Sequence, residues 1–505
     1  MHKHPFARWA VLCVALLGAA AIGLWVAGAG QSTRDPVPLG VRPDSAYWKA
    51  ARTCSRVFPR NADQRRCSQL ALDPSSSTLL AGSAPSLKEA AQQGMYELIG
   101  WHPNGHGSGT FNTNGSNVVS WNYNSGLWAG PELSHWWQSA LALRTLVRYL
   151  ERTGTTSPYY QQVLLRTYRL EVHHPLAIAS SYFVNRFGDD TAWWGLAWVE
   201  AANYELHYMH DISAARTFLS TAEYDARYLE RLKKSCGGIV WKQGFPSDTI
   251  TNAEFTSLAA ELYSSRAVPG PFRDEAKADA WLHDARADLR WIRQSGLVNM
   301  RKGRVSDRLT RSCKRTGGPL TYTQGEMAEA LIQLGNALHR PAYYQQAVRF
   351  LNFATKIGGP SHMVTSSGIM QQPCESKRSL CVPKADEGRL SGTPTETWLD
   401  QLSYKGILAQ AIDDYVSATG SHRFKTFMHR QASAIVNNAI RDPKGRPGDC
   451  GSPSTCQFVF YWAWPLSPRR PMISNTATEM SALDVLTGVL PAHTGGRPLG
   501  PATHS

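Results

Sequence analysis

The chain has 505 residues, of which 42% are hydrophobic, so it can bury a sizeable core, and its length suits either several domains or one large barrel. The formal net charge is +14, but the Lys and Arg residues are spread along the chain, and no RNA- or DNA-binding motif accompanies them. We therefore expect no nucleic-acid partner. A basic exterior can favour anionic envelope polymers or lipid head groups, although a basic surface without any partner explains the charge equally well.

The first thirty residues have the pattern of an export sequence. Lys3 and Arg8 precede an uncharged apolar run over residues 9–29, which ends in a small-residue Ala-Gly-Ala sequence typical of signal-peptide cleavage. The run has 21 residues and is also long enough to span a bilayer. Residues 1–30 are thus a signal peptide or a signal-anchor. Either reading places the remaining chain in the extracellular space or on the outer face of the cell membrane, and residues 9–29 are the membrane tether in the second case.

The cysteine count fits an exported protein. Apart from Cys13 in the apolar run there are eight cysteines, and an even number in an oxidising compartment indicates disulfides. Short loops favour three pairs, namely Cys54–Cys67, Cys374–Cys381 and Cys450–Cys456. Cys236 and Cys313 then either pair or remain free thiols. Zinc binding is disfavoured because no Cys-x-x-Cys pair occurs and the histidines are scattered.

Helical patterns dominate the chain after its first 78 residues. Residues 31–78 are rich in Pro and Arg and predict a linker with a small disulfide-stapled extension, whereas residues 79–490 predict one large domain. Capping boxes at Ser86-Leu-Lys-Glu89, Thr251-Asn-Ala-Glu254 and Thr323-Gln-Gly-Glu326, and apolar stripes at helical spacing, locate helices of this domain. Twelve are expected: 86–99, 134–152, 159–170, 195–208, 212–234, 251–264, 274–294, 323–338, 341–357, 397–419, 422–440 and 475–489. Residues 491–505 are predicted to be a disordered tail.

Twelve helices with almost no alternating strand pattern form six helical hairpins. An open α-solenoid should show a repeat of about 34 to 45 residues, and none is present. Long loops over 101–131, 358–394 and 442–471 suit a closed toroid better, because they can gather at one end and form a cleft. We therefore predict an all-α fold, an (α/α)6 barrel made of six helical hairpins.

The strongest candidate site lies between Asn185 and Trp194. Two adjacent carboxylates, Asp189 and Asp190, follow a glycine and precede a tryptophan pair, where a loop is expected to become a helix. Paired carboxylates about 5 Å apart catalyse retaining glycoside hydrolysis, one as nucleophile and one as acid/base. Because neighbouring helical residues do not face each other, the two acids converge on one sugar only at a helix entry, where Gly188 is expected to supply backbone freedom. Helix capping by aspartate is the structural alternative.

With these residues in view, the chain resembles glycoside hydrolase family 76, the α-1,6-mannanase family. The resemblance rests on segments that occur in order between Trp101 and Val489: WQSALAL from 137, GDDTAWW from 188, CGGIVW from 236, TNAE from 251, SGLV from 295, VSD from 305, TYTQG from 321, SYKGI from 403 and SALDV from 481. The GDDTAWW segment is the most specific. Gly188 departs from the pattern, since an aromatic residue is expected before the aspartate pair.

The resemblance implies an (α/α)6 barrel that cleaves α-1,6-mannosidic linkages internally and with retention, or that transfers the glycan as fungal relatives do. It makes Asp189 the nucleophile and Asp190 the acid/base. One of Trp193 and Trp194 is expected to face the barrel core and the other to stack on sugar. The full set of expected substrate-binding residues is Trp137, Trp193, Trp194, Trp241, Tyr322, Gln324, Asp307 and Asp400.

The sequence thus predicts an exported, monomeric glycosidase that acts on α-mannan or another mannose-containing polysaccharide, without a metal or organic cofactor. Two alternatives stay open at this point. Another (α/α)6 carbohydrate enzyme, such as an unsaturated-uronyl hydrolase, would suit a basic cleft. A non-catalytic glycan-binding envelope protein would bind mannan without needing the aspartate pair.

Overall fold

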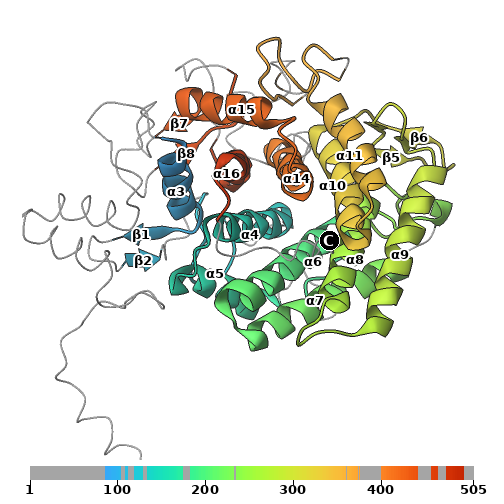
Figure 1. The fold of residues 1–505 in the computed structure, drawn as a ribbon, viewed down its shortest axis with the longest axis horizontal. Helices are drawn as coiled ribbons and strands as arrows, with labels where there is room; N and C mark the ends of the chain where they lie inside the picture. Colours follow the sequence, from blue (N-terminus) through green and yellow to red (C-terminus); the bar gives the residue numbers. More distant parts are fainter. Residues whose placement is uncertain are drawn as a thin grey trace, which may run out of the picture.

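A computed structural model of the protein describes residues 86–103, 109–111, 119–128, 133–173, 182–232, 235–359, 361–372, 375, 400–441, 456–463 and 474–493 (Figure 1). The predicted leader, the stapled extension and the residues after 493 lie outside this part of the chain, as do the pairs Cys54–Cys67 and Cys374–Cys381 and the cysteine at 450. Twelve α-helices are described: α3 (Leu87–Leu98), α4 (Leu133–Thr153), α5 (Pro158–Glu171), α6 (Gly188–Tyr204), α7 (Ile212–Arg231), α8 (Thr249–Ala267), α9 (Glu275–Gln294), α10 (Thr321–Leu338), α11 (Pro341–Ala354), α14 (Tyr404–Thr419), α15 (Lys425–Asn438) and α16 (Thr476–Val489).

Six of these helices form a closed inner ring. Helices α4, α6, α8, α10, α14 and α16 each pack against the next one, and α16 packs against α4 to close the ring. The other helices cover it from outside: α7 packs on α6, α9 on α8, α11 on α10, and both α15 and α3 on α16 (Figure 1). Helix α5 joins this outer layer through Tyr160, which contacts Tyr149 of α4, and Tyr168, which contacts Trp198 of α6. The predicted (α/α)6 barrel is confirmed.

Four short antiparallel ribbons were not predicted. They pair β1 (Trp101–Pro103) with β2 (Gly109–Phe111), β3 (Val298–Asn299) with β4 (Arg304–Val305), β5 (Arg308–Leu309) with β6 (Arg315–Thr316), and β7 (Ile440–Arg441) with β8 (Gln457–Phe458). Strands of two or three residues are too short to leave an alternating pattern in the sequence. They lie in the connections between helices, so they shape the ends of the barrel rather than its wall.

The helix starts agree with the sequence in some places and differ in others. The capping box at Ser86 is confirmed, since its hydroxyl accepts from the Glu89 N–H and the Glu89 carboxylate accepts from the Ser86 N–H. The capping box expected at Thr251 is wrong, because α8 begins two residues earlier and its N-cap is Asp248, whose carboxylate accepts from the Thr251 N–H at 3.2 Å. Helix α10 likewise begins at Thr321, which moves Thr323 from the expected cap into the first turn.

Buried aromatic rings fill the space between α4, α5, α6 and α7. Trp194 stacks on Trp198 with 5.7 Å between ring centroids, and Phe183 lies 4.6 Å from Trp194. Trp136 and Phe218 extend this cluster on either side. Each such ring removes a large apolar area from water, and well-oriented aromatic pairs add about 0.5–1.5 kcal/mol beyond that area. Much of the tryptophan surplus therefore stabilises the barrel wall.

Ionic contacts cross the inside of the ring. Helix α4 carries Arg144, Arg148 and Arg152 at four-residue intervals, so they lie on one face of the helix. Their partners come from three other inner helices: Glu200 of α6, Glu329 of α10, and Asp413 and Asp414 of α14. These pairs fix the positions of inner helices that are far apart in the sequence, and removing one partner of such a buried pair costs about 3–5 kcal/mol.

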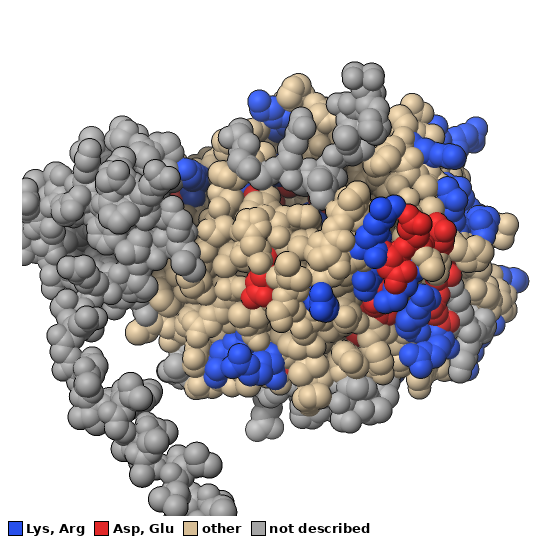
Figure 2. Space-filling view, turned by 60° about the horizontal axis from the view of Figure 1, so that its bottom comes forward, with Lys and Arg blue, Asp and Glu red and all other residues tan. Residues whose placement is uncertain are grey.

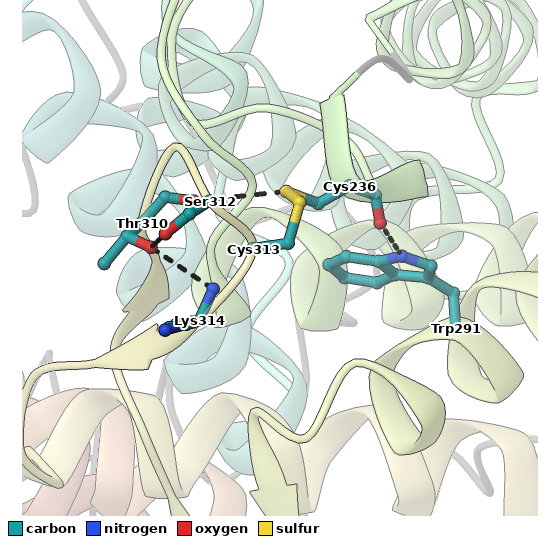
Figure 3. The surroundings of a disulfide bond; sticks show 6 residues. All are labelled: Cys236, Trp291, Thr310, Ser312, Cys313 and Lys314. Carbon is teal, nitrogen blue, oxygen red and sulfur yellow. Dashed lines mark hydrogen bonds between the residues drawn. A yellow bond between two sulfur atoms is a disulfide. The ribbon is translucent and has the colours of Figure 1, made fainter.

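Cys236 and Cys313 form a disulfide, which settles the alternative that the sequence left open for them (Figure 3). Cys456 is disulfide-bonded too. Among the helices that the structure describes, none is long and apolar enough to cross a membrane.

Candidate active site

The carboxylate pair, Asp189 and Asp190, lies in the first turn of α6, at the end of the barrel where the inner helices begin. The segment that follows the disulfide runs alongside this turn. The N–H of Gly188 donates to the carbonyl of Trp241 at 2.6 Å, and Phe187 forms a β-bridge with Lys242. The two segments therefore hold the start of α6 in place.

Gly188 is required here because of close packing. A Cβ at this position would lie 2.6 Å from the carbonyl oxygen of Val240 and 2.7 Å from Cγ2 of Thr251. Its φ angle is not positive, so the expectation that Gly188 provides unusual backbone freedom is wrong. The aromatic residue expected at this position in the family pattern has no room against Val240 and Thr251.

Each acid of the pair is held by its own donors. The indole Nε1 of Trp241 donates to Oδ2 of Asp189 at 2.8 Å, and the backbone N–H of Asp190 donates to Oδ1 of Asp189 at 3.0 Å. The Nδ2 of Asn185 donates to Oδ2 of Asp190 at 2.7 Å. Asn185 is itself oriented by the N–H of Phe187, which donates to its Oδ1 at 2.7 Å. Both carboxylates are thus fixed in orientation before any substrate binds.

The surroundings raise the pKa of both carboxyl groups, but unequally. Burial raises the pKa of Asp189 to about 7, although the hydrogen bond from Trp241 acts in the opposite direction. Burial also raises the pKa of Asp190 well above its usual value, with further contributions from the charges of Asp189 and Asp400. Because the two acids are buried next to each other, ionising both at once is unfavourable, so one can stay protonated as the acid while the other is ionised as the nucleophile.

Two more acids, Asp248 and Asp307, and two tyrosines, Tyr322 and Tyr404, lie near the pair. Asp248 caps α8, and its pKa is raised well above the ordinary value by burial and by Asp189. The hydroxyl of Tyr322 donates to Oδ1 of Asp307 at 3.4 Å, and the ring of Tyr322 stacks on Tyr404 with 3.9 Å between centroids. Burial raises the pKa of Asp307 as well, although its side chain, like that of Asp189, is still partly exposed.

The predicted substrate-binding residues divide into those near the pair and those away from it. Trp241 contacts Asp189, and Asp400 lies close enough to raise the pKa of Asp190. Tyr322 and Asp307 join them through the hydrogen bond described above. Trp137 is half-buried in the first turn of α4, at the same end of the ring.

Three of the expected sugar contacts are not brought to the site. Trp193 and Trp194 are only 2% and 0% exposed, so neither ring has a free face, and the expectation that one of them stacks on sugar is wrong. Gln324 is buried, and its side-chain amide donates to the carbonyl of Gly303 at 3.0 Å and accepts from the N–H of Val305 at 2.9 Å. Its amide supports the loop before Asp307, and this corrects its predicted role.

Sequence reasoning missed Asn185, Asp248 and Tyr404. Asp248 had a usable pattern, because an aspartate directly before a helical run is a favoured N-cap and inner-helix starts gather at one end of the barrel. Asn185 had no comparable pattern, and Tyr404 lies in the family segment SYKGI, which does not by itself point to the site. The position of Asn185 depends on a loop. That of Tyr404 depends on the packing of α14 against α10, and these helices begin about eighty residues apart in the sequence.

One group of acids has the spacing of metal ligands. Glu200, Glu261 and Glu329 place carboxylate oxygens within 4.8 Å of one another. Glu200 and Glu329 already bind the guanidinium of Arg144, at 2.8 and 2.6 Å, so positive charge is supplied there by the protein itself. None of the three residues contacts the carboxylate pair.

The closed ring of six inner helices, covered by outer helices and carrying hydrogen-bonded carboxylates at one end, places the protein in the class of (α/α)6 barrels. The sequence matches the family described as Glycosyl hydrolase family 76 over residues 86–493. The chain belongs to this family.

Solved structures agree with this assignment at the level of the fold. An α-1,6-mannanase of Salegentibacter sp. HEL1_6, inactivated at two neighbouring aspartates and bound to α-1,6-mannotetrose, has a TM-score of 0.55 and 17% identity, over 80% of this chain and 98% of that one. Dfg5 from Chaetomium thermophilum, in complex with glucosamine, has a TM-score of 0.52 and 18% identity, over 74% of this chain and 89% of that one. The mannosidase Bt3792 from Bacteroides thetaiotaomicron matches with a TM-score of 0.51 at 11% identity, over 80% and 98%. A search of curated proteins gave no match.

Proposed function

We propose that this protein is a retaining endo-α-1,6-mannosidase or mannan transglycosidase, with Asp189 as nucleophile and Asp190 as acid/base. The observation that carries the proposal is the carboxylate pair at the start of α6, in which Trp241 and Asn185 hold the two acids in place by hydrogen bonds and burial raises the pKa of both. Support also comes from the Salegentibacter mannanase, which was inactivated at two neighbouring aspartates and binds an α-1,6-linked mannan fragment.

In the first step, an oxygen of ionised Asp189 forms a bond to the anomeric carbon while the glycosidic carbon–oxygen bond breaks. Asp190 gives its proton to the leaving oxygen. In the second step, Asp190 takes a proton from an incoming hydroxyl, whose oxygen displaces Asp189 from the same carbon. Water as the incoming group gives hydrolysis, and a sugar hydroxyl gives transglycosylation, both with net retention.

We further propose that the protein is exported and acts as a monomer outside the cell or on the outer face of its membrane. The apolar run at residues 9–29 supports this location. If the run remains as an anchor, the enzyme would remodel glycan of its own envelope. If the run is removed, the enzyme would degrade external mannan.

The proposal is tested by incubating linear α-1,6-mannan with the full chain, with Asp189→Asn and with Asp190→Asn, and by reading the products by mass spectrometry. We expect shortened oligosaccharides from the wild type and a loss of at least about 10³-fold in each variant, because each removes a group that takes part in bond breaking. Products longer than the input would identify transglycosylation. Mannan that is bound but uncut by the wild type would replace the proposal with a glycan-binding role.

A further inference from the structure

Two hairpins beside the carboxylate pair carry an unusual concentration of positive charge. They are the β3–β4 hairpin, residues 298–305, and the β5–β6 hairpin, residues 308–316, and we call them together the basic hairpin pair. Seven Lys or Arg residues fall within 301–315, against one acid, Asp307. All seven are exposed: Arg301, Lys302, Arg304, Arg308, Arg311, Lys314 and Arg315.

Among the residues that the structure describes, few acids neutralise this charge. Within the described part of the chain, Arg308 is the one member of the seven that forms an ion pair, with Asp307 at 3.3 Å. Basic residues on α7, α8 and α9 are different, since Arg227 pairs with Glu230, and Arg266 and Lys277 both pair with Glu223. Figure 2 shows one face of the molecule on which positive and negative groups lie side by side in this mixed way. As far as the described residues go, the basic hairpin pair is therefore a cationic surface with little neutralising charge.

The basic hairpin pair is held firmly against the site. The disulfide ties Cys313 at the tip of the β5–β6 hairpin to Cys236, and the carbonyl of Cys236 accepts from the indole of Trp291 at 2.7 Å (Figure 3). At the base of the hairpin, the N–H of Leu309 donates to the carbonyl of Ser247 at 3.0 Å. Asp307, the residue before the hairpin, faces Tyr322 in the site. The first cation of the β5–β6 hairpin, Arg308, is thus the residue directly after Asp307 of the site.

A second basic group flanks the carboxylate pair. Lys242 places Nζ 4.5 Å from the centroid of Phe187, the residue that caps α6, and the guanidinium of Arg186 lies 5.4 Å from the same ring. Next to them Phe245 is 42% exposed. Exposed aromatic rings are platforms for sugar, and cations beside them attract anions. Positive charge therefore lies beside the start of α6 as well as on the basic hairpin pair.

This arrangement provides separate binding places for a neutral sugar and for an anionic group. The buried carboxyl groups at the centre would repel an anionic sugar, so the sugar that is cleaved there is neutral. An anionic group can bind only at the rim, and five of the seven hairpin cations are arginines, whose planar fork suits phosphate oxygens. We propose that the basic hairpin pair binds a phosphate ester carried by the glycan, some sugar units from the cleaved linkage. This identification of the substrate as phosphorylated mannan rests on the proposed function.

An anionic membrane surface would also attract these cations. The glycan explains more of the structure, because positive charge lies both beside Phe187 at the start of α6 and beside Asp307 through Arg308, as a chain entering the site would require. Arginine and lysine side chains next to the reaction centre can also position a glycan chain for cleavage. A membrane-binding surface, in contrast, has no reason to lie beside the catalytic acids.

The test compares binding of α-1,6-mannotetraose with binding of the same oligosaccharide phosphorylated on its terminal unit, by calorimetry, using the full chain in uncharged detergent. Arg311→Glu with Lys314→Glu reverses two exposed cations whose side chains make no described contact with the carboxylate pair. Arg340→Glu with Lys425→Glu is the matched control, because it changes the net charge equally at the other end of the barrel, where inner helices α10 and α14 end.

We expect the wild type to bind the phosphorylated oligosaccharide about tenfold more tightly in low salt, with the difference shrinking as salt is added. The hairpin variant should lose this difference, and the control should keep it. Equal wild-type affinity for the two oligosaccharides would overturn the proposal. So would equal losses in both variants, or binding to phosphatidylglycerol vesicles without preference between the oligosaccharides. Cleavage of neutral mannan is measured separately, so a failure of the proposed function is recognised by itself.

Discussion

The ionisation of Asp189 depends on the indole N–H of Trp241, which donates to its carboxylate at 2.8 Å. Burial raises the pKa of Asp189 to about 7, and this hydrogen bond holds it down. A nucleophile must be ionised, so activity should fall as the pH drops through this pKa. Trp241→Phe removes the donor and raises the pKa further. We expect the acid limb of kcat/KM against pH to move upward by about 1 unit, whereas Trp291→Phe, whose indole binds a backbone carbonyl elsewhere, should leave it in place.

The alkaline limb is expected to respond to Asp400. The negative charge of Asp400 contributes to the raised pKa of Asp190, which must stay protonated to act as the acid. Asp400→Asn removes that charge, so the pKa of Asp190 falls and the alkaline limb of kcat/KM should move to lower pH. If the alkaline limb of Asp400→Asn stays at the wild-type pH or moves to a higher pH, Asp400 does not act on Asp190.

Lys405 and Glu375 form a fully buried ion pair of 3.0 Å, and the ammonium also lies 4.2 Å from the rings of Phe460 and Trp462. Lys405→Met would leave the Glu375 carboxylate without its positive partner. We expect the free energy of unfolding to fall by about 3–5 kcal/mol in denaturant titrations. Adding Glu375→Gln to Lys405→Met should recover part of this loss, and a double variant less stable than the single one would contradict the explanation.

At the scale of the element, the start of α6 depends on the absence of a side chain at Gly188. Gly188→Ala places a Cβ 2.6 Å from the carbonyl oxygen of Val240, so the first turn must shift. Overpacking of this kind costs about 1–3 kcal/mol of stability. Because Asp189 and Asp190 lie in that turn, we expect a much larger relative loss of kcat than of folded protein. Gly270→Ala is the control, since nothing lies within 4 Å of its added Cβ.

The helices that the sequence predicted best are those with a local start pattern. Ser86 and Asp274 are caps whose side-chain hydrogen bonds depend only on residues three positions later. The starts of α6, α8 and α10 were placed late because they lie where chain segments meet. Asp248, for example, caps α8 while Ser247 accepts a hydrogen bond from Leu309. Such starts are fixed by contacts across the barrel, which a sequence window does not contain.

The same distinction, between features set by neighbouring residues and features set by contacts across the barrel, applies to the predicted residues of the site. Asp189 and Asp190 could be proposed from the sequence because paired carboxylates are visible in two adjacent letters and a family pattern surrounds them. The roles of Trp193, Trp194 and Gln324 were mispredicted because burial and hydrogen bonding decide them. Aromatic and amide side chains serve equally well in a core and in a sugar site, so composition alone does not distinguish the two uses.

At the scale of the whole molecule, the barrel encloses acids whose protons are hard to remove. Burial raises the pKa of Glu205 to about 7, and that of Asp484 to about 7 as well. A carboxyl group with a raised folded pKa stabilises the folded state fully only below its unfolded pKa, and that contribution is lost as the pH rises towards the folded value. The free energy of unfolding should therefore decrease between about pH 4.5 and pH 7, as the unfolded chain ionises first.

Glu205→Gln tests this origin of the pH dependence. The amide cannot ionise, and its oxygen can still accept from Nε2 of Gln161, which lies 2.8 Å from the native carboxylate. We expect the variant to match the wild type near pH 4 and to exceed it at pH 8 by up to about 3 kcal/mol, measured by denaturant unfolding. Asp279→Asn, at an exposed position of α9, should give a difference near zero at both pH values. A Glu205→Gln variant that is less stable than the wild type at pH 8 would mean that the carboxylate is stabilised by its surroundings, and that the interior of the barrel solvates charge better than its burial indicates.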